Sequence, residues 1–452
     1  MTTETMNSTD LFRLMQKIDM GKIAKLAQQV DLGELMEALE HVDPKMLKQM
    51  LKKSNGGSKK PAPPVNGDFY DIAADLNEDD RARLTLVRTF MEREVKPIAA
   101  EYWNKDEFPR HLLPGFAAMT AEVFGERPFI FPHSDPLMAG LFTMELARVD
   151  ASMATFFGVH WGLGMGSINA FGSDEQKARW LPAMRRFEKI GSWALTEPEV
   201  GSAAAAGLRT TARREGDTWV INGAKKWSGN ATFADVNVIM ARDVEGNQVK
   251  AFLIERDTPG YIVEKLEGKI AQRMVENADI TLDNVRVPES SRLPGVNAFK
   301  DISWQLSSAR AIVAWQATGL SMGAYETALR YAQTREQFGK PIGGFQLVQN
   351  MLVQMLGNVT AMQSMMLRLA TLEARDGEVS HEHASLAKAF CGEKMRETVA
   401  LGRGLLGGNG ILLQHDAARQ FADAEAIYSY EGTHEMNTLI VGRAITGQSA
   451  FV

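Results

Sequence analysis

Apolar residues recur three and four positions apart over most of this chain, the spacing that gathers them on one face of a helix. The pattern predicts short helices in residues 9–53, further helices in 68–190, and long helices from residue 301 to the end. No proline interrupts residues 304–334 or 344–376. We therefore expect four long helices with short links to form a C-terminal bundle.

The pattern changes to short β-type runs between residues 191 and 300. Turn signals such as Asn222-Gly223 and Thr258-Pro259-Gly260 separate these runs. The predicted strands are 210–213, 219–222, 236–241, 251–255, 261–264 and 279–287. Several short strands between turns, with few helices, predict a small antiparallel β-domain.

A stretch rich in Gly, Ser, Lys and Pro separates the first predicted helices from the rest of the chain, and its composition is typical of a linker. The predicted domains are a helical appendage at 1–53, a flexible linker at 54–67, an N-terminal α-helical domain at 68–190, a β-domain at 191–300 and a C-terminal helical bundle at 301–452. The expected fold class is α+β, mainly helical: an N-terminal helical domain, a small antiparallel β-domain and a C-terminal four-helix bundle, with an extra N-terminal helical appendage.

Composition narrows the class of protein. The 452 residues are 45% hydrophobic and 23% charged, which is typical of a globular protein with a sizeable core. A net charge of −6 argues against nucleic-acid binding. No apolar run reaches the roughly 20 residues of a membrane span, and no secretory signal is visible, so we expect a cytoplasmic protein. The single cysteine, Cys391, excludes an intramolecular disulfide, a Cys-based zinc site and an iron–sulfur cluster.

Several common catalytic and cofactor signatures fail in this sequence. Residues 402–407 match G-x-G-x-x-G, but a helical run rather than a strand precedes them, so we interpret them as a helix end. The run His381-Glu382-His383 does not complete H-E-x-x-H and fits a solvated helix start capped by Ser380. We therefore predict no metal site. The Walker A loop and the G-x-S-x-G elbow are both absent.

Three other segments are candidates for chemistry. Residues 193–202 and 226–230 combine a tryptophan with glycine and hydroxyl groups, and residues 430–435 place Glu431 between two helical runs. A carboxylate beside glycine in an apolar setting can act as a desolvated base. Taken alone, each segment is more often an ordinary strand, a core tryptophan or a turn.

Together and in this order, the segments resemble the acyl-CoA dehydrogenase family over residues 68–450. The matching motifs are T-E-P-x-x-G-S at 196–202, W-x-x-N at 227–230, R-x-x-F-G with a following Q at 335–346, G-G-N-G at 407–410 and Y-E-G-T at 430–433. The sequence is most similar to the branch that holds glutaryl-CoA dehydrogenases and plant-type short-chain acyl-CoA oxidases. The run R-A-I-T-G at 443–447 is typical of that branch.

The resemblance implies an enzyme that uses FAD to convert a short-chain acyl-CoA, straight or branched, to trans-2-enoyl-CoA in fatty-acid β-oxidation. Glu431 would abstract the α-proton while flavin N5 takes the β-hydride. Desolvation would raise the pKa of this carboxyl toward neutrality. In the family, the backbone N–H of the glutamate and a flavin hydroxyl bond the thioester oxygen, as in an oxyanion hole. Gly432 would let the backbone approach that thioester.

The resemblance also implies binding residues and partners. The residues expected at FAD are Trp193, Leu195, Thr196, Gly201, Ser202, Trp227, Ser228, Gly229, Arg335, Phe338, Gln346, Gly407, Gly408, Thr433 and Glu435. The residues expected at acyl-CoA are Ser202, Arg310, Tyr430, Gly432 and Arg443. Arg335 and Gln346 would reach the FAD of a neighbouring subunit, so we expect a homodimer or homotetramer. The expected electron acceptor is an electron-transfer flavoprotein or O2.

Departures from the family pattern refine these expectations. Ala154 and Gly158 stand where glutaryl-CoA dehydrogenases carry an arginine and a serine for the far carboxylate, so we expect an acyl chain without that charge. Gly229 replaces a threonine beside flavin N5, which we expect to leave space for O2, as in the plant oxidases. Residues 124–132 replace a glycine-rich loop that borders the acyl site. A short-chain acyl-CoA oxidase is the first alternative function, and a non-catalytic helical scaffold of the same fold is the second.

Overall fold

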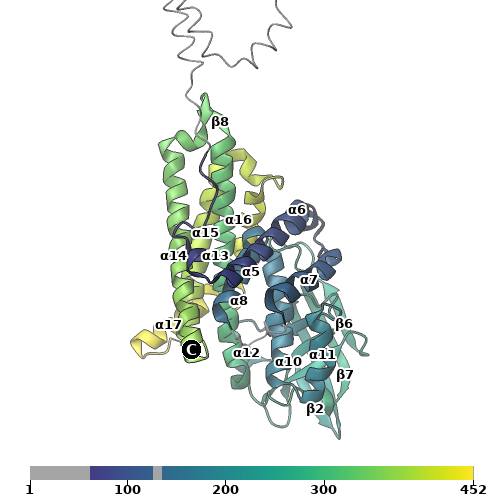
Figure 1. The fold of residues 1–452 in the computed structure, drawn as a ribbon. Coiled ribbons are helices and arrows are strands. Elements are labelled where there is room, and N and C mark those ends of the chain that lie inside the picture. The colour runs from purple at the N-terminus through teal and green to yellow at the C-terminus, as the bar shows by residue number, and fades with distance from the viewer. Residues whose placement is uncertain (1–61, 126–134, 451–452) are drawn as a thin grey trace, which may run out of the picture. The chain divides into compact units, whose positions relative to one another are not determined.

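The computed structural model describes residues 62–125 and 135–450 (Figure 1). Nearly every described residue belongs to one compact unit, Val65–Val452. The helices predicted in residues 9–53 and most of the predicted linker lie outside the described residues, as does most of the 124–132 stretch.

Helices make up the described chain as far as residue 185. They are η1 (Ile72–Asp75), α5 (Glu78–Phe90), η2 (Met91–Val95), α6 (Lys96–Lys105), η3 (Arg110–Leu112), α7 (Leu113–Phe124), α8 (Pro136–Val149), α9 (Ala151–Phe157), η4 (Gly158–Met165), α10 (Gly166–Phe171) and α11 (Asp174–Arg185). Polar side chains define several starts, because they accept hydrogen bonds from otherwise unpaired N–H groups. Asp150 caps α9 in this way, and Ser173 forms a capping box with Gln176 at the start of α11.

A single sheet follows. Its strands are β1 (Gly191–Ala194), β2 (Thr211–Glu215), β3 (Thr218–Ser228), β4 (Val236–Asp243), β5 (Val249–Glu255), β6 (Tyr261–Lys265) and β7 (Ala278–Pro288), with the short helix α12 (Ala204–Gly207) after β1. The strand order is β1-β4-β2-β3-β7-β6, and β5 pairs with β4. Most pairs are antiparallel, as predicted, but β4 runs parallel to both β1 and β2. The pattern of apolar positions cannot distinguish parallel from antiparallel pairing, because a strand buries the same face of the sheet in either case.

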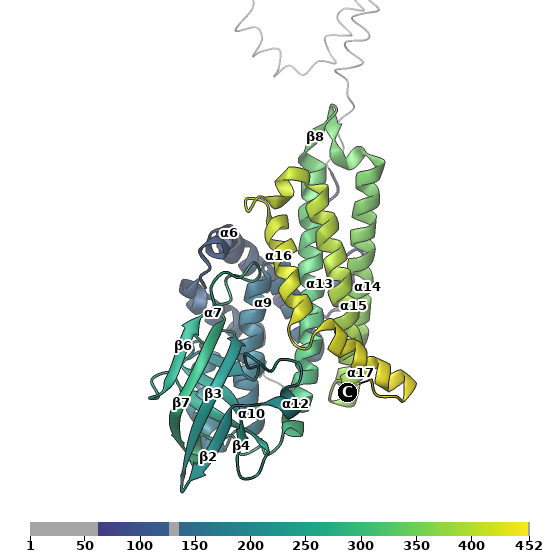
Figure 2. The ribbon, with the colours of Figure 1, turned by 180° about the vertical axis from the view of Figure 1, so that it is seen from behind.

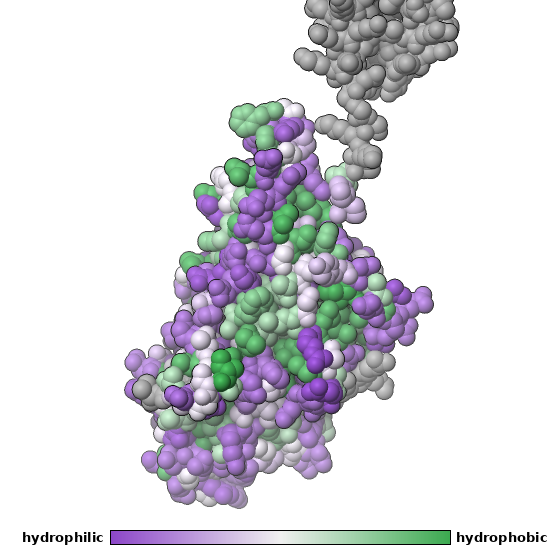
Figure 3. All heavy atoms as spheres, turned by 90° about the vertical axis from the view of Figure 1, so that its left-hand side faces the viewer, coloured by the Kyte–Doolittle hydropathy of each residue, from purple (hydrophilic) through white to green (hydrophobic). Residues whose placement is uncertain are grey.

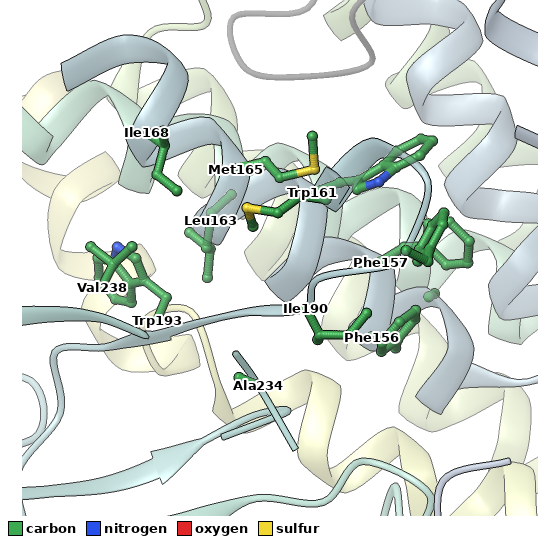
Figure 4. Close-up of a cluster of buried hydrophobic side chains, with 14 of the residues drawn as sticks. Phe156, Phe157, Trp161, Leu163, Met165, Ile168, Ile190, Trp193, Ala234 and Val238 are labelled. Atoms are coloured by element: carbon green, nitrogen blue, oxygen red, sulfur yellow. The ribbon is translucent and has the colours of Figure 1, made fainter. Parts of the chain in front are cut away.

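The sheet packs on the N-terminal helices through a shared apolar core (Figure 4). Phe156, Phe157 and Trp161 come from α9 and η4, while Trp193 and Val238 come from β1 and β4. His160 adds a polar link between the two layers. Its Nδ1 accepts the N–H of Gly191 and its Nε2 donates to the carbonyl of Met184. Burial lowers the pKa of His160 to about 4, so the ring stays neutral.

Helices return after the sheet and form a bundle (Figures 1 and 2). The elements are η5 (Glu289–Ser291), η6 (Phe299–Ile302), α13 (Ser303–Thr334), β8 (Glu336–Gln337), β9 (Lys340–Pro341), η7 (Ile342–Gly344), α14 (Gln346–Asp376), α15 (His381–Leu405), η8 (Gly407–Ile411), α16 (Asp416–Ser429) and α17 (His434–Thr446). Helices α13, α14 and α15 are each continuous, and the last stretch forms two shorter helices, α16 and α17, on either side of the loop predicted at 430–435. The division is the turn 430–433, where the backbone leaves the helical region.

The fold class predicted from the sequence is confirmed: the chain is mainly helical, with a small β-sheet domain and a helical C-terminal region. The predicted domain bounds stay predictions. None of the described helices is long and apolar enough to cross a membrane. Within residues 62–125 and 135–450, no group of three His, Cys, Asp or Glu side chains could hold a metal ion.

Candidate functional site

The turn between α16 and α17 presents Glu431. Both Glu431 (φ 54°) and Gly432 (φ 83°) have left-handed backbone conformations. This region is unfavourable for a residue with a Cβ, so the surrounding structure must hold Glu431 in place. Thr433 closes the turn by capping α17, with its side chain accepting the N–H of Met436 at 3.3 Å.

The carboxyl of Glu431 is partly buried and faces two cations. Burial raises its pKa, while the charges of Arg310 and Lys388 act in the opposite direction and leave it above its ordinary value. A carboxyl with a raised pKa is a stronger proton acceptor once it is ionised. Glu431 therefore has the electrostatic environment of a general base.

Lys388 of α15 bonds the backbone at this turn. Its buried ammonium donates to the carbonyl of Tyr428 at 3.0 Å and to that of Gly432. Asn437 donates to the same Gly432 carbonyl at 2.9 Å. Lys388 was not predictable from the sequence, since a lysine within an amphipathic helix usually lies on the solvated face.

Tyr430 is held by three polar side chains from separate elements. Its hydroxyl donates to Gln316 of α13 at 2.5 Å, accepts from Gln272 at 3.2 Å, and lies 3.2 Å from the hydroxyl of Thr155 on α9. Burial raises the pKa of Tyr430, so the phenol stays protonated. Tyr430 was predicted from the sequence as a site residue. Its hydrogen-bond partners were not predicted, because they are far apart along the chain.

Arg310 borders the same turn. A Cβ added to Gly432 would lie 3.6 Å from its Nε, and that buried Nε has no hydrogen-bond partner within the described chain. Arg310 Nη1 lies 3.3 Å from Nδ1 of His381. Burial lowers the pKa of His381, and the charges of Arg310 and Arg443 lower it further. The two arginines expected at acyl-CoA thus lie at the same end of the bundle as Glu431. Ser380 caps α15, as predicted.

The sheet contributes polar atoms that need a partner. The Nε1 of Trp193 and the hydroxyl of Ser228 are buried, with no hydrogen-bond partner within the described chain. Trp227 has a φ of 67°, and 54% of its surface is exposed. Buried donors without partners are rare in native structures. A bound group with hydrogen-bonding atoms and a flat ring would satisfy Trp193 and Ser228 and cover Trp227.

A buried ion pair fixes the loop that follows β1. Glu197 accepts the N–H groups of Arg209 and Thr210 and the ammonium of Lys225, the last at 2.9 Å. Lys225 also donates to the carbonyl of Leu195 at 3.1 Å. These bonds join the expected cofactor segment 193–202 to the strand that ends at Ser228. Glu197 belongs to the predicted T-E-P-x-x-G-S motif, whereas Lys225 was not predicted. Farther along that loop, Gly201 and Ser202 are exposed.

Helix α9 and its continuation η4 connect the sheet residues with the turn that carries Glu431. Thr155 contacts Tyr430, and Val159 lies one helical turn later on the same face. A Cβ added to Gly229 would lie only 3.1 Å from Val159. Gly229 and Tyr430 are therefore close in space. A side chain at position 229 would press on Val159 and Val275, while the space expected there for O2 stays a prediction.

A second group of predicted residues lies at the far end of the bundle. Arg335 is about 25 residues beyond Arg310 along α13, which at about 1.5 Å per residue is roughly 37 Å. Phe338 is 93% exposed on the β8–β9 hairpin, and Gln346 starts α14. Asn409 bonds Tyr331 at 2.8 Å, so Gly407 and Gly408 also lie at this end. One chain therefore does not bring these residues to Glu431.

Three sequence models of the acyl-CoA dehydrogenase family match the chain. The N-terminal domain model matches residues 77–188, the middle domain model 192–285 and the C-terminal domain model 299–446.

Individual relatives agree with these models. The human mitochondrial short-chain specific acyl-CoA dehydrogenase is 32% identical over 380 residues, covering 82% of this chain and 90% of the relative. The crystal structure of a glutaryl-CoA dehydrogenase from Mycobacterium smegmatis in complex with FADH2 is similar, with 32% identity, a TM-score of 0.81, and coverage of 85% of this chain and 98% of that one. The butyryl-CoA dehydrogenase structure from Megasphaera elsdenii has 27% identity and a TM-score of 0.76 over 82% of this chain and 99% of its own.

Proposed function

The chain belongs to the acyl-CoA dehydrogenase family and is an oxidoreductase of that family. From this premise we propose that it converts a short-chain acyl-CoA to the trans-2-enoyl-CoA, with Glu431 as the base. FAD is the cofactor, and when bound it supplies the acceptor for the hydride that leaves the β-carbon. The observation that carries the proposal is the partly buried carboxyl of Glu431, whose pKa burial raises.

Glu431 removes the α-proton of the thioester. That C–H bond is a weak acid, so the site must stabilise negative charge that develops on the thioester oxygen. The backbone N–H of Glu431 is the donor we assign to that oxygen. Gly432 carries no side chain to block the approach, and the nearest atoms to a Cβ there would be Asn437 at 3.3 Å and Arg310 at 3.6 Å.

The residues on the sheet fit FAD. Trp193 and Ser228 offer unpaired buried hydrogen-bonding atoms, and the exposed Trp227 offers a flat apolar surface for a ring. The same two segments, 193–202 and 226–230, also contain the proposed FAD residues Leu195, Thr196, Gly201, Ser202 and Gly229. On the turn side, Thr433 and the exposed Glu435 complete the set proposed for this end.

We propose that the far-end residues complete the FAD site of a second copy. These residues are too distant from Glu431 to contact the FAD bound beside it in the same chain. They are Arg335, Phe338, Gln346, Gly407 and Gly408. A guanidinium suits phosphate oxygens because its planar fork matches them. Apolar side chains also stay exposed on this part of the molecule, among them Leu347 at 81%. The face in Figure 3 shows apolar patches between hydrophilic ones. We therefore propose a homodimer or homotetramer.

An acyl chain without a distal charge is the proposed substrate. Ala154 and Phe157 are buried and apolar, and Gly158 adds no polar side chain. A terminal carboxylate would lose its hydration there without gaining a cationic partner. The polar groups nearby, on Tyr430 and Gln316, bond to each other at 2.5 Å.

Anaerobic titration of the FAD-loaded protein tests the proposal. Butyryl-CoA and isovaleryl-CoA are expected to bleach the flavin absorbance, whereas glutaryl-CoA is not. A protein that stays colourless with added FAD, or a flavin that no acyl-CoA bleaches, would contradict the function. Bleaching by glutaryl-CoA alone would contradict the substrate class.

The proposed electron acceptor is an electron-transfer flavoprotein rather than O2. The position of Val159 supports this choice, because a Cβ added to Gly229 would lie only 3.1 Å from it, so the missing side chain leaves little room there. Admitting air to the substrate-reduced protein tests it. Slow reoxidation is expected, and rapid reoxidation with release of peroxide would establish the oxidase alternative.

A further inference from the structure

Lys388 joins the two ends of the turn that carries Glu431. Tyr428, whose carbonyl it binds at 3.0 Å, lies in the last turn of α16. Carbonyls in a last turn have no partner within the helix, and a cation there also interacts favourably with the helix dipole. The second carbonyl that Lys388 binds belongs to Gly432, directly after Glu431. Tyr428 and Gly432 are thus fixed to a single ammonium group.

We propose that Lys388 is a positioning residue for Glu431: its buried ammonium holds the left-handed turn in place and provides the fixed positive charge that faces the carboxylate. The inference rests on the proposed function, because it gives Lys388 a role in proton removal by Glu431. The hydrogen bonds of the Lys388 ammonium go to two backbone carbonyls, those of Tyr428 and Gly432.

The two cations near Glu431 are not equivalent. Arg310 of α13 contacts His381, and within the described chain it bonds no backbone group of the turn. Lys388 of α15 bonds the turn twice and is only 2% exposed. Loss of Lys388 therefore removes both a charge and two backbone hydrogen bonds, whereas Arg310 would still supply its charge.

The charges around Lys388 set its own ionisation. Burial lowers its pKa to about 8, and the charge of Arg310 lowers it too, whereas the charges of Glu431 and Glu435 raise it. Lys388 is therefore cationic at neutral pH and becomes neutral as the pH rises above about 8. Glu431 ionises more easily while Lys388 is charged, because opposite charges stabilise each other.

The pH profile of flavin reduction by butyryl-CoA tests this role in the FAD-loaded enzyme. Lys388→Met removes the charge at similar size. Without the cation the pKa of Glu431 rises, so the acid limb of the profile is expected to move up by about one pH unit, lowering the rate in acid about tenfold. Lys394→Met is the matched control, because Lys394 lies on the same helix but pairs with Glu397 at the surface. An acid limb that stays at its wild-type position in Lys388→Met would overturn the proposal.

Lys388→Arg provides a second variant that keeps the charge. Its guanidinium does not lose its proton in the accessible range. The wild-type rate is expected to decline above about pH 8 as Lys388 is neutralised, and the decline is expected to be absent in Lys388→Arg. Identical alkaline limbs in the two proteins would count against Lys388 as the charged group.

Hydrogen exchange of the amides in residues 429–433 gives a readout that needs no turnover. The oxidised holoenzyme of Lys388→Met is expected to exchange these amides faster than Lys394→Met or wild type. Equal protection in all three would overturn the role in holding the turn. A wild-type flavin that no acyl-CoA reduces would refute only the proposed function, and the exchange measurement would still decide this inference.

Discussion

At the scale of single residues, Glu431 combines two unfavourable features. Its backbone is left-handed and its carboxyl is partly buried. Such strain persists only where surrounding contacts enforce it. Here the contacts are the bonds from Lys388 and Asn437 to Gly432 and the polar partners of Tyr430. The carboxyl is therefore preorganised before any substrate arrives.

Glu431→Gln should abolish substrate-dependent flavin reduction. The amide keeps the size of the side chain but cannot accept the proton, and loss of a general base costs roughly a hundredfold to ten-thousandfold in rate. Stopped-flow bleaching by butyryl-CoA measures the loss. Glu425→Gln is the control, since Glu425 pairs with Arg396 at the surface of α16. Near-normal reduction in Glu431→Gln would assign the base elsewhere.

The wild-type rate should also fall toward acid at a higher pH than an ordinary glutamate would give. Burial raises the pKa of Glu431, and only its ionised form removes a proton. The rate therefore rises with pH through that raised pKa and then levels off, until the decline expected above about pH 8 from the neutralisation of Lys388. A profile of initial flavin reduction between pH 5 and 9 measures this. An acid limb centred near pH 4.3, the ordinary glutamate value, would show that burial has no effect.

Residues within local motifs could be predicted from the sequence, but the residues that hold them in place through hydrogen bonds could not. Glu431, Tyr430 and Arg310 could be named in advance, because a resemblance transfers positions along the chain. Lys388, Gln272 and Gln316 could not, since their roles depend on which helices pack together. The same holds at Gly229. The sequence shows that this position lacks a side chain, but not that Val159 packs beside it.

At the scale of elements, the bundle meets the N-terminal helices through a close contact between α13 and α8. A Cβ on Gly319 would lie 2.2 Å from the carbonyl of Met144, and one on Gly323 would lie 2.0 Å from that of Arg148. Both distances are shorter than any real contact allows, and a backbone carbonyl cannot swing aside. The two glycines, one helical turn apart, set how closely the helices approach.

Gly323→Ala should therefore destabilise the fold by about 3 kcal/mol, the upper range for overpacking a core. Chemical denaturation of the FAD-free protein measures the change. Gly392→Ala in α15 is the matched control, because its Cβ would meet only a ring carbon of Tyr428 at 3.6 Å. There the better helix propensity of alanine should stabilise by up to about 1 kcal/mol. Equal effects of the two substitutions would refute the close-contact explanation.

The long helices were the easiest elements to predict. The predicted 304–334 and 344–376 correspond to Ser303–Thr334 and Gln346–Asp376, because an uninterrupted three-and-four pattern leaves few alternatives. The parallel partner of β1 was not predictable, since β1 and β4 are far apart in sequence and their registry depends on the loops between them. The break between α16 and α17 was predicted at 430–435, but the left-handed backbone of residues 431 and 432 that forms it was not.

At the scale of the whole molecule, the proposed FAD residues lie at two distant places. If the far-end group serves a neighbouring copy, damage there should affect assembly and cofactor together. Phe338→Asp puts a charge on a side chain that is 93% exposed in one chain. We expect a shift toward monomer by light scattering and at least a severalfold loss of bound FAD. Val244→Asp, at another exposed apolar position, is the control. A Phe338→Asp protein with unchanged mass and flavin content would refute the shared site.

The separation of Arg335 from Glu431 has a genetic consequence. Each complete site would contain Glu431 from one chain and Arg335 from its neighbour. A chain with a defective base could therefore still contribute an intact Arg335 to the neighbour's site. Two inactive alleles, one altered at Glu431 and one at Arg335, would then complement each other in the same cell. Mixed assemblies would regain a fraction of working sites, whereas either allele alone would have none.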